Sequence, residues 1–566
     1  MTRVLAASLL AVFATVLVAD AQREYRPQLA VPDSMQPFLK RLDPANDEGF
    51  PLERGAKELD ARLKELSDAF RANPARVGDA TKGLLDPGFR GARLLPPDDG
   101  RAEGQLQVDR ATDLPHEPDL DARSFGAELQ RLTHDLRDIS VAELLITSID
   151  GDPAASLHTT VRYDIVGAGA TAYRAEHVGE WDMTWRKNAG GWQVTRWTAV
   201  SHVVSRAKSP IFNEITGSAL GQTDAFRRQL NIDLDSWMAT FDSVLTRDSN
   251  GHHGVAIGDA DGDGIDDLYV AQPAGLPNRL FRNRGDSTFE DITDTAGVGV
   301  LDDTAASLFA DVDNDGDEDL VLATATQPLL FLNDGKGHFT QMPDAFRFAQ
   351  PLKGVLTSIT MADYDRDGFL DLYLCVYSYF FGAGEDKAGT PSPYYDARNG
   401  PPGVLFRNDG HGKFVEATKD AGLDAGNDRY HFAAAWGDYD GDGWPDLLVS
   451  NDFGTKNLYH NLGRRNGKVT FEDVAAGAGV LDHGAGMSAT FVDYDNDGKL
   501  DIYTGNMWSA PGLRVTAAPT LMPDATPEVR ALYKRHVRGN SLFRNLGDGR
   551  FEDKTVDAHA QMGRWS

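Results

Sequence analysis

Residues 259–271 read DADGDGIDDLYVA, an acidic turn that runs directly into an apolar segment. The acidic part follows the nine-residue pattern D-x-D-x-D-G-x-x-D, which occurs five times in the chain. The copies start at residues 259, 311, 363, 438 and 493, so the intervals are 52, 52, 75 and 55 residues. A period near 50 residues is typical of a repeat architecture.

Each acidic copy lies between two short apolar segments, as VAIGD (255–259) and DLYVA (267–271) illustrate for the first copy. A second unit follows, and in the first copy it reads NRLFRNRGDSTFEDIT (278–293). Apolar segments on either side of an Asn/Gly turn predict two further strands. Each repeat is therefore predicted to be a four-stranded antiparallel meander. Such sheets in radial order form a β-propeller, so the predicted fold class is mainly β.

This pattern resembles the FG-GAP/VCBS repeat family, whose members include the integrin α-chain propellers and the cartilage acidic protein family. The resemblance covers residues 251–555 and rests on five acidic motifs and five LFxNxGxGxF-like units in matching order. It implies a β-propeller with calcium-binding loops. Integrin-like propellers have seven blades, and the internal spacing places a sixth motif near 573–577, beyond Ser566. We therefore interpret the five repeats as a truncated propeller.

The acidic motif favours calcium. Asp at positions 1, 3 and 5 gathers three carboxylates on one side of a turn, and Gly at position 6 permits the bend. The position 7 carbonyl and the position 9 Asp complete an oxygen cage for a cation that takes six to eight oxygens. Without a cation, the carboxylates would repel one another. We expect about five Ca²⁺ sites with these residues: Asp259, Asp261, Asp263, Ile265 and Asp267; Asp311, Asp313, Asp315, Asp317 and Asp319; Asp363, Asp365, Asp367, Phe369 and Asp371; Asp438, Asp440, Asp442, Trp444 and Asp446; Asp493, Asp495, Asp497, Lys499 and Asp501.

An EF-hand is excluded, because it requires a bidentate Glu at position 12 and flanking helices. Position 12 is occupied by Val270, Leu322, Leu374, Val449 and Thr504, and the flanking segments have strand character. We expect the calcium to be structural, holding together the first two strands of each blade.

The N-terminus predicts export. Residues 1–21 combine a basic start, an apolar stretch from Val4 to Val18 and the cleavage pattern Ala19-Asp20-Ala21, as in a secretory signal peptide. The mature protein is expected to be secreted, periplasmic or at the cell surface. No later segment is long and apolar enough for a membrane-spanning helix.

Three further regions precede the repeats at 251–566. Residues 22–120 are predicted to be helical but loosely ordered, ending in a polar linker, and residues 121–208 to form a small α+β domain of one helix and about four strands. A connecting strand at 212–216 and a helix at 224–246 are expected within 209–250. The 121–208 pattern resembles the nuclear transport factor 2-like cone fold, whose enzymes use Asp or His inside the cone. His134, His177 and His202 are candidates for such a role, although surface or core histidines are the simpler interpretation.

Composition limits the possible partners. The chain has 56 Lys and Arg against 86 Asp and Glu, a net charge of −30. This argues against binding to nucleic acid or to an anionic membrane. Cys375 is the only cysteine, which excludes an intrachain disulfide, and its apolar neighbours predict a buried thiol.

Two long insertions follow the second strand of their repeats, at about 380–402 and 507–539. They are expected to project from the face opposite the calcium loops. The first carries aromatic residues and the second basic residues, which suggests a protein or glycan ligand on that face. These residues are Tyr379, Phe380, Phe381, Tyr394 and Tyr395, then Arg530, Lys534, Arg535, His536 and Arg538.

The predicted function is an exported calcium-binding β-propeller that acts as a binding, adhesion or scaffold module. No catalytic motif is found: G-x-S-x-G, HExxH and a phosphate loop are all absent from the sequence. The alternative is an extracellular enzyme, either a propeller of the polysaccharide lyase kind or a cone-fold isomerase or hydrolase.

Overall fold

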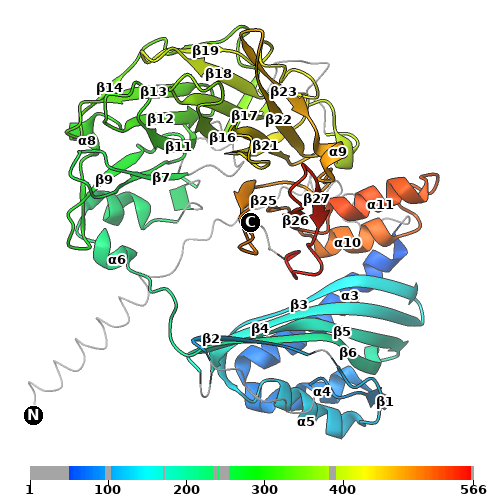
Figure 1. Ribbon diagram of the computed structural model, residues 1–566. Coiled ribbons are helices and arrows are strands. Elements are labelled where there is room, and N and C mark those ends of the chain that lie inside the picture. Colours follow the sequence, from blue (N-terminus) through cyan, green and yellow to red (C-terminus); the bar gives the residue numbers. More distant parts are fainter. Residues whose placement is uncertain are drawn as a thin grey trace, which may run out of the picture.

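The computed structural model describes residues 50–95, 104–111, 113–169, 172–233, 236–237, 239–240, 254–380 and 391–562. The structure is mainly β and has two parts, an N-terminal sheet with helices and a series of smaller sheets (Figure 1). The predicted signal peptide at 1–21 lies outside the described residues. Among the described helices, none has the length and apolar character needed to cross a membrane.

The N-terminal part is a six-stranded sheet with helices packed against one face (Figure 1). Its order is β1-β6-β5-β4-β3, and β2 also pairs with β6. The strands are β1 (Leu85–Gly91), β2 (Leu106–Arg110), β3 (Leu136–Asp152), β4 (Ser156–Gly169), β5 (Arg174–Asn188) and β6 (Gly191–Ala207). The helices are α3 (Pro51–Ala72), η3 (Pro74–Arg76), α4 (Val77–Leu84) and α5 (Ala122–Leu132).

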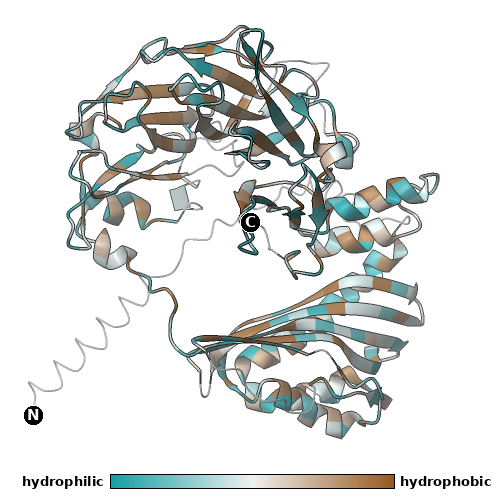
Figure 2. Ribbon diagram, in the orientation of Figure 1, coloured by the Kyte–Doolittle hydropathy of each residue, from teal (hydrophilic) through white to brown (hydrophobic). Residues whose placement is uncertain are grey.

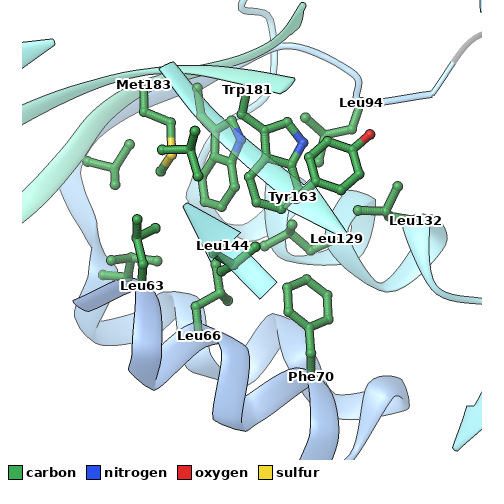
Figure 3. Packing of buried hydrophobic residues seen from close by; sticks show 14 of the residues in the cluster. Leu63, Leu66, Phe70, Leu94, Leu129, Leu132, Leu144, Tyr163, Trp181 and Met183 are labelled. Carbon is green, nitrogen blue, oxygen red and sulfur yellow. The ribbon is translucent and has the colours of Figure 1, made fainter. Parts of the chain in front are cut away.

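One hydrophobic core joins these helices to the sheet. Leu63, Leu66 and Phe70 of α3 face Tyr163 and Trp181 of the strands, as Figure 3 shows, and all five side chains are buried. The one helix and four long strands expected within 121–208 are present. The expected boundary near residue 120 is not, because β1 and β2 belong to the same sheet and α3 to the same core.

The connection between the two parts differs from the prediction. No strand forms at 212–216: the segment is irregular and then enters α6 (Thr216–Ala219), and Phe212 is 92% exposed. Within the helix expected over 224–246, the structure describes η4 (Phe226–Leu230) and two helical residues at 236–237, whereas residues 234–235, 238 and 241–246 lie outside the described part of the chain. Apolar residues around η4 pack against Phe281 of the first repeat, so this part of the connection lies against the repeat region.

Each repeat forms an antiparallel sheet whose four strands pair in chain order, and the third repeat adds β15 at its edge. The sheets follow one another along an arc (Figure 1).

The strand bounds of the five sheets follow in chain order. The first sheet contains β7 (Val255–Gly258), β8 (Asp267–Val270), β9 (Arg279–Asn283) and β10 (Phe289–Asp291), and the second contains β11 (Thr304–Ala310), β12 (Asp319–Thr324), β13 (Pro328–Asn333) and β14 (Phe339–Gln341). The third contains β15 (Phe346–Arg347), β16 (Gly354–Ala362), β17 (Asp371–Tyr379), β18 (Val404–Asn408) and β19 (Phe414–Glu416). The last two contain β20 (His431–Gly437), β21 (Asp446–Asn451), β22 (Asn457–Arg465) and β23 (Lys468–Asp473), then β24 (Thr490–Val492), β25 (Asp501–Thr504), β26 (Ser541–Asn545) and β27 (Phe551–Asp553). Single turns of helix follow two of the sheets, α8 (Thr293–Ala296) and α9 (Ala475–Ala478), and η5 (Tyr394–Asp396) lies in the first insertion.

Neighbouring sheets pack through apolar faces, and Figure 2 shows brown strands along the middle of the series. At two interfaces a bulky side chain lies on a glycine of the preceding sheet. A Cβ on Gly258 would lie 2.6 Å from Phe309 Cβ, and one on Gly437 would lie 2.6 Å from the Phe491 ring. Cys375 is fully buried, as predicted, and burial raises the pKa of its thiol.

The second insertion connects the two parts of the molecule. It forms α10 (Ala510–Ala517) and α11 (Pro527–His536), and α10 contacts β3 (Figure 1). Arg514 donates to the two carboxylate oxygens of Glu53 at 3.1 and 2.9 Å and to the carbonyl of Ile146 at 2.6 Å. The insertion therefore braces the repeat region against the N-terminal sheet.

Candidate metal centres

Five acidic loops join the first and second strands of the repeat sheets. We number the loops in chain order and call the residues of D-x-D-x-D-G-x-x-D positions 1 to 9. The loops are loop 1 (259–267), loop 2 (311–319), loop 3 (363–371), loop 4 (438–446) and loop 5 (493–501).

Each loop folds around the carboxylate at position 1. Asp259 Oδ2 accepts a hydrogen bond from Gly264 N–H at 2.8 Å, and Oδ1 accepts one from Asp263 N–H at 3.1 Å. The same two bonds recur in loops 2 to 5, at 2.9 to 3.1 Å. The backbone at position 6 is left-handed in all five loops, with φ between 84° and 97°. Glycine adopts this conformation without a steric penalty, so it is the suitable residue there.

The carboxylate at position 9 anchors each loop to the sheet. Asp267 Oδ2 accepts from Ala260 N–H at 3.1 Å, and Oδ1 accepts from Asn283 N–H of the third strand at 2.7 Å. Loops 2 to 5 repeat this arrangement. The five position 9 side chains are at most 1% exposed. The loop and the LFxN strand that follows it are thus one structural unit.

The buried carboxylates at position 9 have raised pKa values. Burial, with repulsion from neighbouring loop carboxylates added to it, raises the pKa of Asp267 to about 6, of Asp319 to about 7 and of Asp371 to about 8. The Asp446 pKa rises to about 7 and that of Asp501 also rises, both mainly through burial. A bound cation would offset both the lost hydration and the repulsion.

The residues present fit a hard divalent cation. In the described structure, the Oδ1 atoms of Asp261, Asp313 and Asp365 are buried and accept no hydrogen bond. Carboxylate oxygens of positions 1, 3 and 5 lie within 4.8 Å of one another in loops 1 and 2, as do those of positions 1, 3 and 9 in loops 3 and 4. An all-oxygen set of this kind suits Ca²⁺. The carbonyl role predicted for position 7 stays a prediction.

His460 is a functional candidate that sequence reasoning missed. Its Nδ1 lies 3.1 Å from Asp446 Oδ1 and 3.5 Å from Asp440 Oδ2. It occupies the residue before the LFxN asparagine, where three of the other copies have arginine. That alignment of strand positions was the available signal.

The face opposite the acidic loops carries an aromatic cluster. Tyr394 of the first insertion packs on Phe453 with ring centroids 5.6 Å apart, and Tyr430 lies 5.5 Å from Phe453. Tyr377 and Phe432 extend the cluster through contacts of 5.5 to 5.9 Å. Tyr394 is 48% exposed, so part of the cluster reaches solvent. Residues 381–390, including Phe381, lie outside the described part of the chain.

Four of the five basic residues expected beside this cluster contact other parts of the molecule, and the fifth, Lys534, is exposed. Arg530 donates to backbone carbonyls of the same insertion. Arg535 pairs with Asp482 at 2.8 Å, Arg538 pairs with Asp553 at 3.3 Å, and His536 is buried. These four residues are therefore not free to bind the protein or glycan ligand predicted for this face, whereas the exposed Tyr394 of the aromatic group is.

The N-terminal sheet does contain a buried Asp–His pair, the feature that would favour a cone-fold enzyme. Asp135 Oδ1 lies 2.9 Å from His177 Nε2, and the Tyr163 hydroxyl lies 2.7 Å from His202 Nδ1. However, Trp181, Leu94 and other side chains fill the space over the sheet (Figure 3). His134 is exposed at the end of α5. A cavity of about 320 Å³ lies elsewhere, where α3, β3 and α10 meet.

The repeat region matches a known family. The model of the FG-GAP-like repeat matches residues 259–322, 311–374, 395–449 and 438–504. These matches begin at or span loops 1 to 5, so the family assignment and the loop geometry concern the same residues.

Curated relatives match across the same half of the chain. Human cartilage acidic protein 1 is 27% identical over 297 residues, which are 50% of this chain and 42% of that protein. The mouse protein is 26% identical over 307 residues, 48% of this chain and 43% of its own length. The chain thus spans less than half of these relatives. A solved lectin from Agrocybe aegerita covers 53% of this chain and 65% of its own, with 17% identity and a TM-score of 0.32.

Proposed function

Because residues 259–374 and 395–504 match the FG-GAP-like repeat, we propose that the chain is an extracellular, non-enzymatic binding scaffold whose repeats each hold one structural calcium ion. The observation that carries the proposal is the fivefold recurrence of one hydrogen-bond network. In every loop, position 1 binds the turn and position 9 binds the third strand. A cation among these carboxylates would tie the first three strands of a repeat together.

The number of bound ions tests this proposal. Equilibrium dialysis of the chain against Ca²⁺, followed by metal analysis, should give about five ions per molecule. Asp311→Ala should lower that number by one, because it removes the carboxylate around which loop 2 folds. Asp548→Ala is the matched control: Asp548 lies in an exposed turn and pairs with Arg550. Wild-type binding of one ion or none would contradict the proposal.

We propose further that a protein or glycan ligand engages the aromatic cluster opposite the loops. Exposed tyrosines offer apolar area and a hydroxyl at little entropic cost, and aromatic residues are enriched in binding interfaces. Tyr394→Ala should therefore reduce binding to a glycan array or to a purified protein ligand by at least about tenfold if Tyr394 is a central contact. Tyr173→Ala, an equally exposed tyrosine of the N-terminal sheet, is the control. Equal binding by both variants would exclude this face.

A further inference from the structure

The residue before the LFxN asparagine contacts the acidic loop of its own repeat in four of the five copies, and its identity differs among the copies. It is Arg282, Leu332, Arg407, His460 and Arg544 in loops 1 to 5. From these contacts we infer that this strand position grades the calcium affinity of the loops, with loop 2 the tightest site and loops 3 and 5 the weakest. The inference rests on the proposed function and concerns the ranking of its sites.

In loops 3 and 5 an arginine already pairs with the carboxylates that a cation needs. Arg407 Nε lies 3.1 Å from Asp365 Oδ2, and its Nη2 lies 3.1 Å from Asp367 Oδ2. Arg544 Nε lies 2.6 Å from Asp495 Oδ2, and its Nη2 lies 3.2 Å from Asp497 Oδ2. Each guanidinium thus bridges positions 3 and 5. A metal ion must displace this group or bind beside its positive charge.

Loop 5 carries a second competitor. Lys499 occupies position 7, and its Nζ lies 2.8 Å from Asp497 Oδ2. Two positive side chains therefore approach the position 5 carboxylate of loop 5. Loop 3 has a weaker second contact, between Arg464 and Asp365 at 3.9 Å.

Loop 2 has no such competitor. Leu332 replaces the basic residue, and no ion pair to Asp311, Asp313, Asp315 or Asp319 is found within the described ranges. Position 7 adds another acidic residue, Asp317, whereas the carboxylate of the neighbouring Glu318 lies at loop 1, where it accepts from Asp259 N–H at 2.8 Å. The buried Oδ1 of Asp313 has no hydrogen-bond partner in the described structure. Among the described contacts, loop 2 thus has five aspartates, no basic competitor and a free ligand atom.

Loops 1 and 4 are intermediate. Arg282 lies 3.6 Å from Asp261, but it is drawn away by Glu290 at 2.6 Å. His460 contacts Asp440 and Asp446 in loop 4. Its imidazole is smaller than a guanidinium, and in the neutral form one of its two ring nitrogens has a lone pair that can bind a metal.

The size of the effect follows from Coulomb's law. A single positive charge about 6 Å from a divalent ion in a solvent-exposed loop weakens binding about tenfold. The side chains of Arg544 and Arg407 are 38% and 55% exposed. Water and dissolved ions therefore screen their charges, and the loss of calcium affinity stays near tenfold.

Calorimetric titration of the metal-free full chain with Ca²⁺ tests the ranking in four variants. Arg544→Leu and Arg407→Leu should each tighten one weak site about tenfold, and Leu332→Arg should remove one site from the tightest class. Arg550→Leu is the control. This substitution removes one positive charge from the same repeat as Arg544→Leu, but Arg550 pairs with Asp548, which lies outside the acidic loops. It should titrate like the wild type.

The outcomes separate this inference from the proposed function. If the wild type binds about five ions but Arg544→Leu and Arg407→Leu titrate like Arg550→Leu, the ranking of the loops is wrong and the proposal of five calcium sites is unaffected. If no ion binds to the wild type, the proposed function itself fails. Circular dichroism identifies a Leu332→Arg chain that does not fold. In that case the two arginine variants, which alter exposed side chains, decide the ranking.

Discussion

Removal of calcium should lower the midpoint of thermal unfolding of this protein by roughly 20 °C or more. A ligand that binds only the native state stabilises it by about 2.7 kcal/mol per site at a free concentration of 100 Kd. Five sites of this kind give a large sum even if some are weaker. The physical source is the set of buried position 9 carboxylates, which are at most 1% exposed.

A matched substitution separates metal binding from structural damage. Asp371→Asn keeps the shape of the side chain but removes its charge from loop 3. Burial raises the pKa of Asp371 to about 8, so burial disfavours the ionised carboxylate of Asp371 in the metal-free protein. The variant removes this charge but also replaces one of the two oxygens that accept from Tyr364 N–H and Asn408 N–H, so its metal-free form should melt somewhat below the wild type, and its stabilisation by calcium should be smaller by the contribution of one site. Equal melting of the wild type with calcium and with chelator would contradict the prediction.

Asp482→Ala should destabilise the protein by about 3–5 kcal/mol, because it leaves buried positive charges without their partner. Asp482 is 1% exposed and lies where the last two repeats meet the second insertion. Its carboxylate lies 2.8 Å from Arg535 and 3.8 Å from Lys456, and it accepts from Ser541 at 2.7 Å. Burial opposes its ionisation, yet Lys456 and Arg535 hold the pKa of Asp482 well below its usual range.

Urea denaturation measures the loss of unfolding free energy in Asp482→Ala. A double-mutant cycle with Lys456 shows how much of that loss comes from the pair. Lys456 is buried, and burial lowers its pKa to about 8 despite the opposing charge of Asp482. Lys456→Met in the Asp482→Ala background should therefore recover part of the lost stability, because the unpaired ammonium group is removed. Asp524→Ala, a change in the exposed part of the same insertion, serves as the control. A loss below about 1 kcal/mol for Asp482→Ala would show that the network contributes little.

The sequence was most informative where one short segment determines its own structure. An acidic loop folds through hydrogen bonds between residues at most eight positions apart and one asparagine on the following strands. Fivefold repetition made this pattern visible, and the predicted four-stranded sheets and their order are confirmed. The family resemblance is confirmed by the FG-GAP-like matches. The metal ligands themselves stay a prediction.

The sequence was least informative where structure depends on distant partners. The segment around Phe226 packs against Phe281 of the first repeat, a contact that the helical period of residues 224–246 does not reveal. Arg535 and Arg538 read as a surface patch, yet Asp482 and Asp553, which they bind, cannot be paired with them from spacing alone. The link from Arg514 to Glu53 joins residues 461 positions apart.

The most direct test of the account is an anomalous diffraction map from crystals grown with Ca²⁺, or with Tb³⁺ in its place. The account predicts one peak in each acidic loop, within bonding distance of the carboxylates at positions 1, 3 and 5. The peaks in loops 3 and 5 should be the first to weaken as the ion concentration is lowered. A map in which crystals of the folded protein show no peaks at these loops, at an ion concentration that saturates ordinary calcium sites, would contradict the central claim.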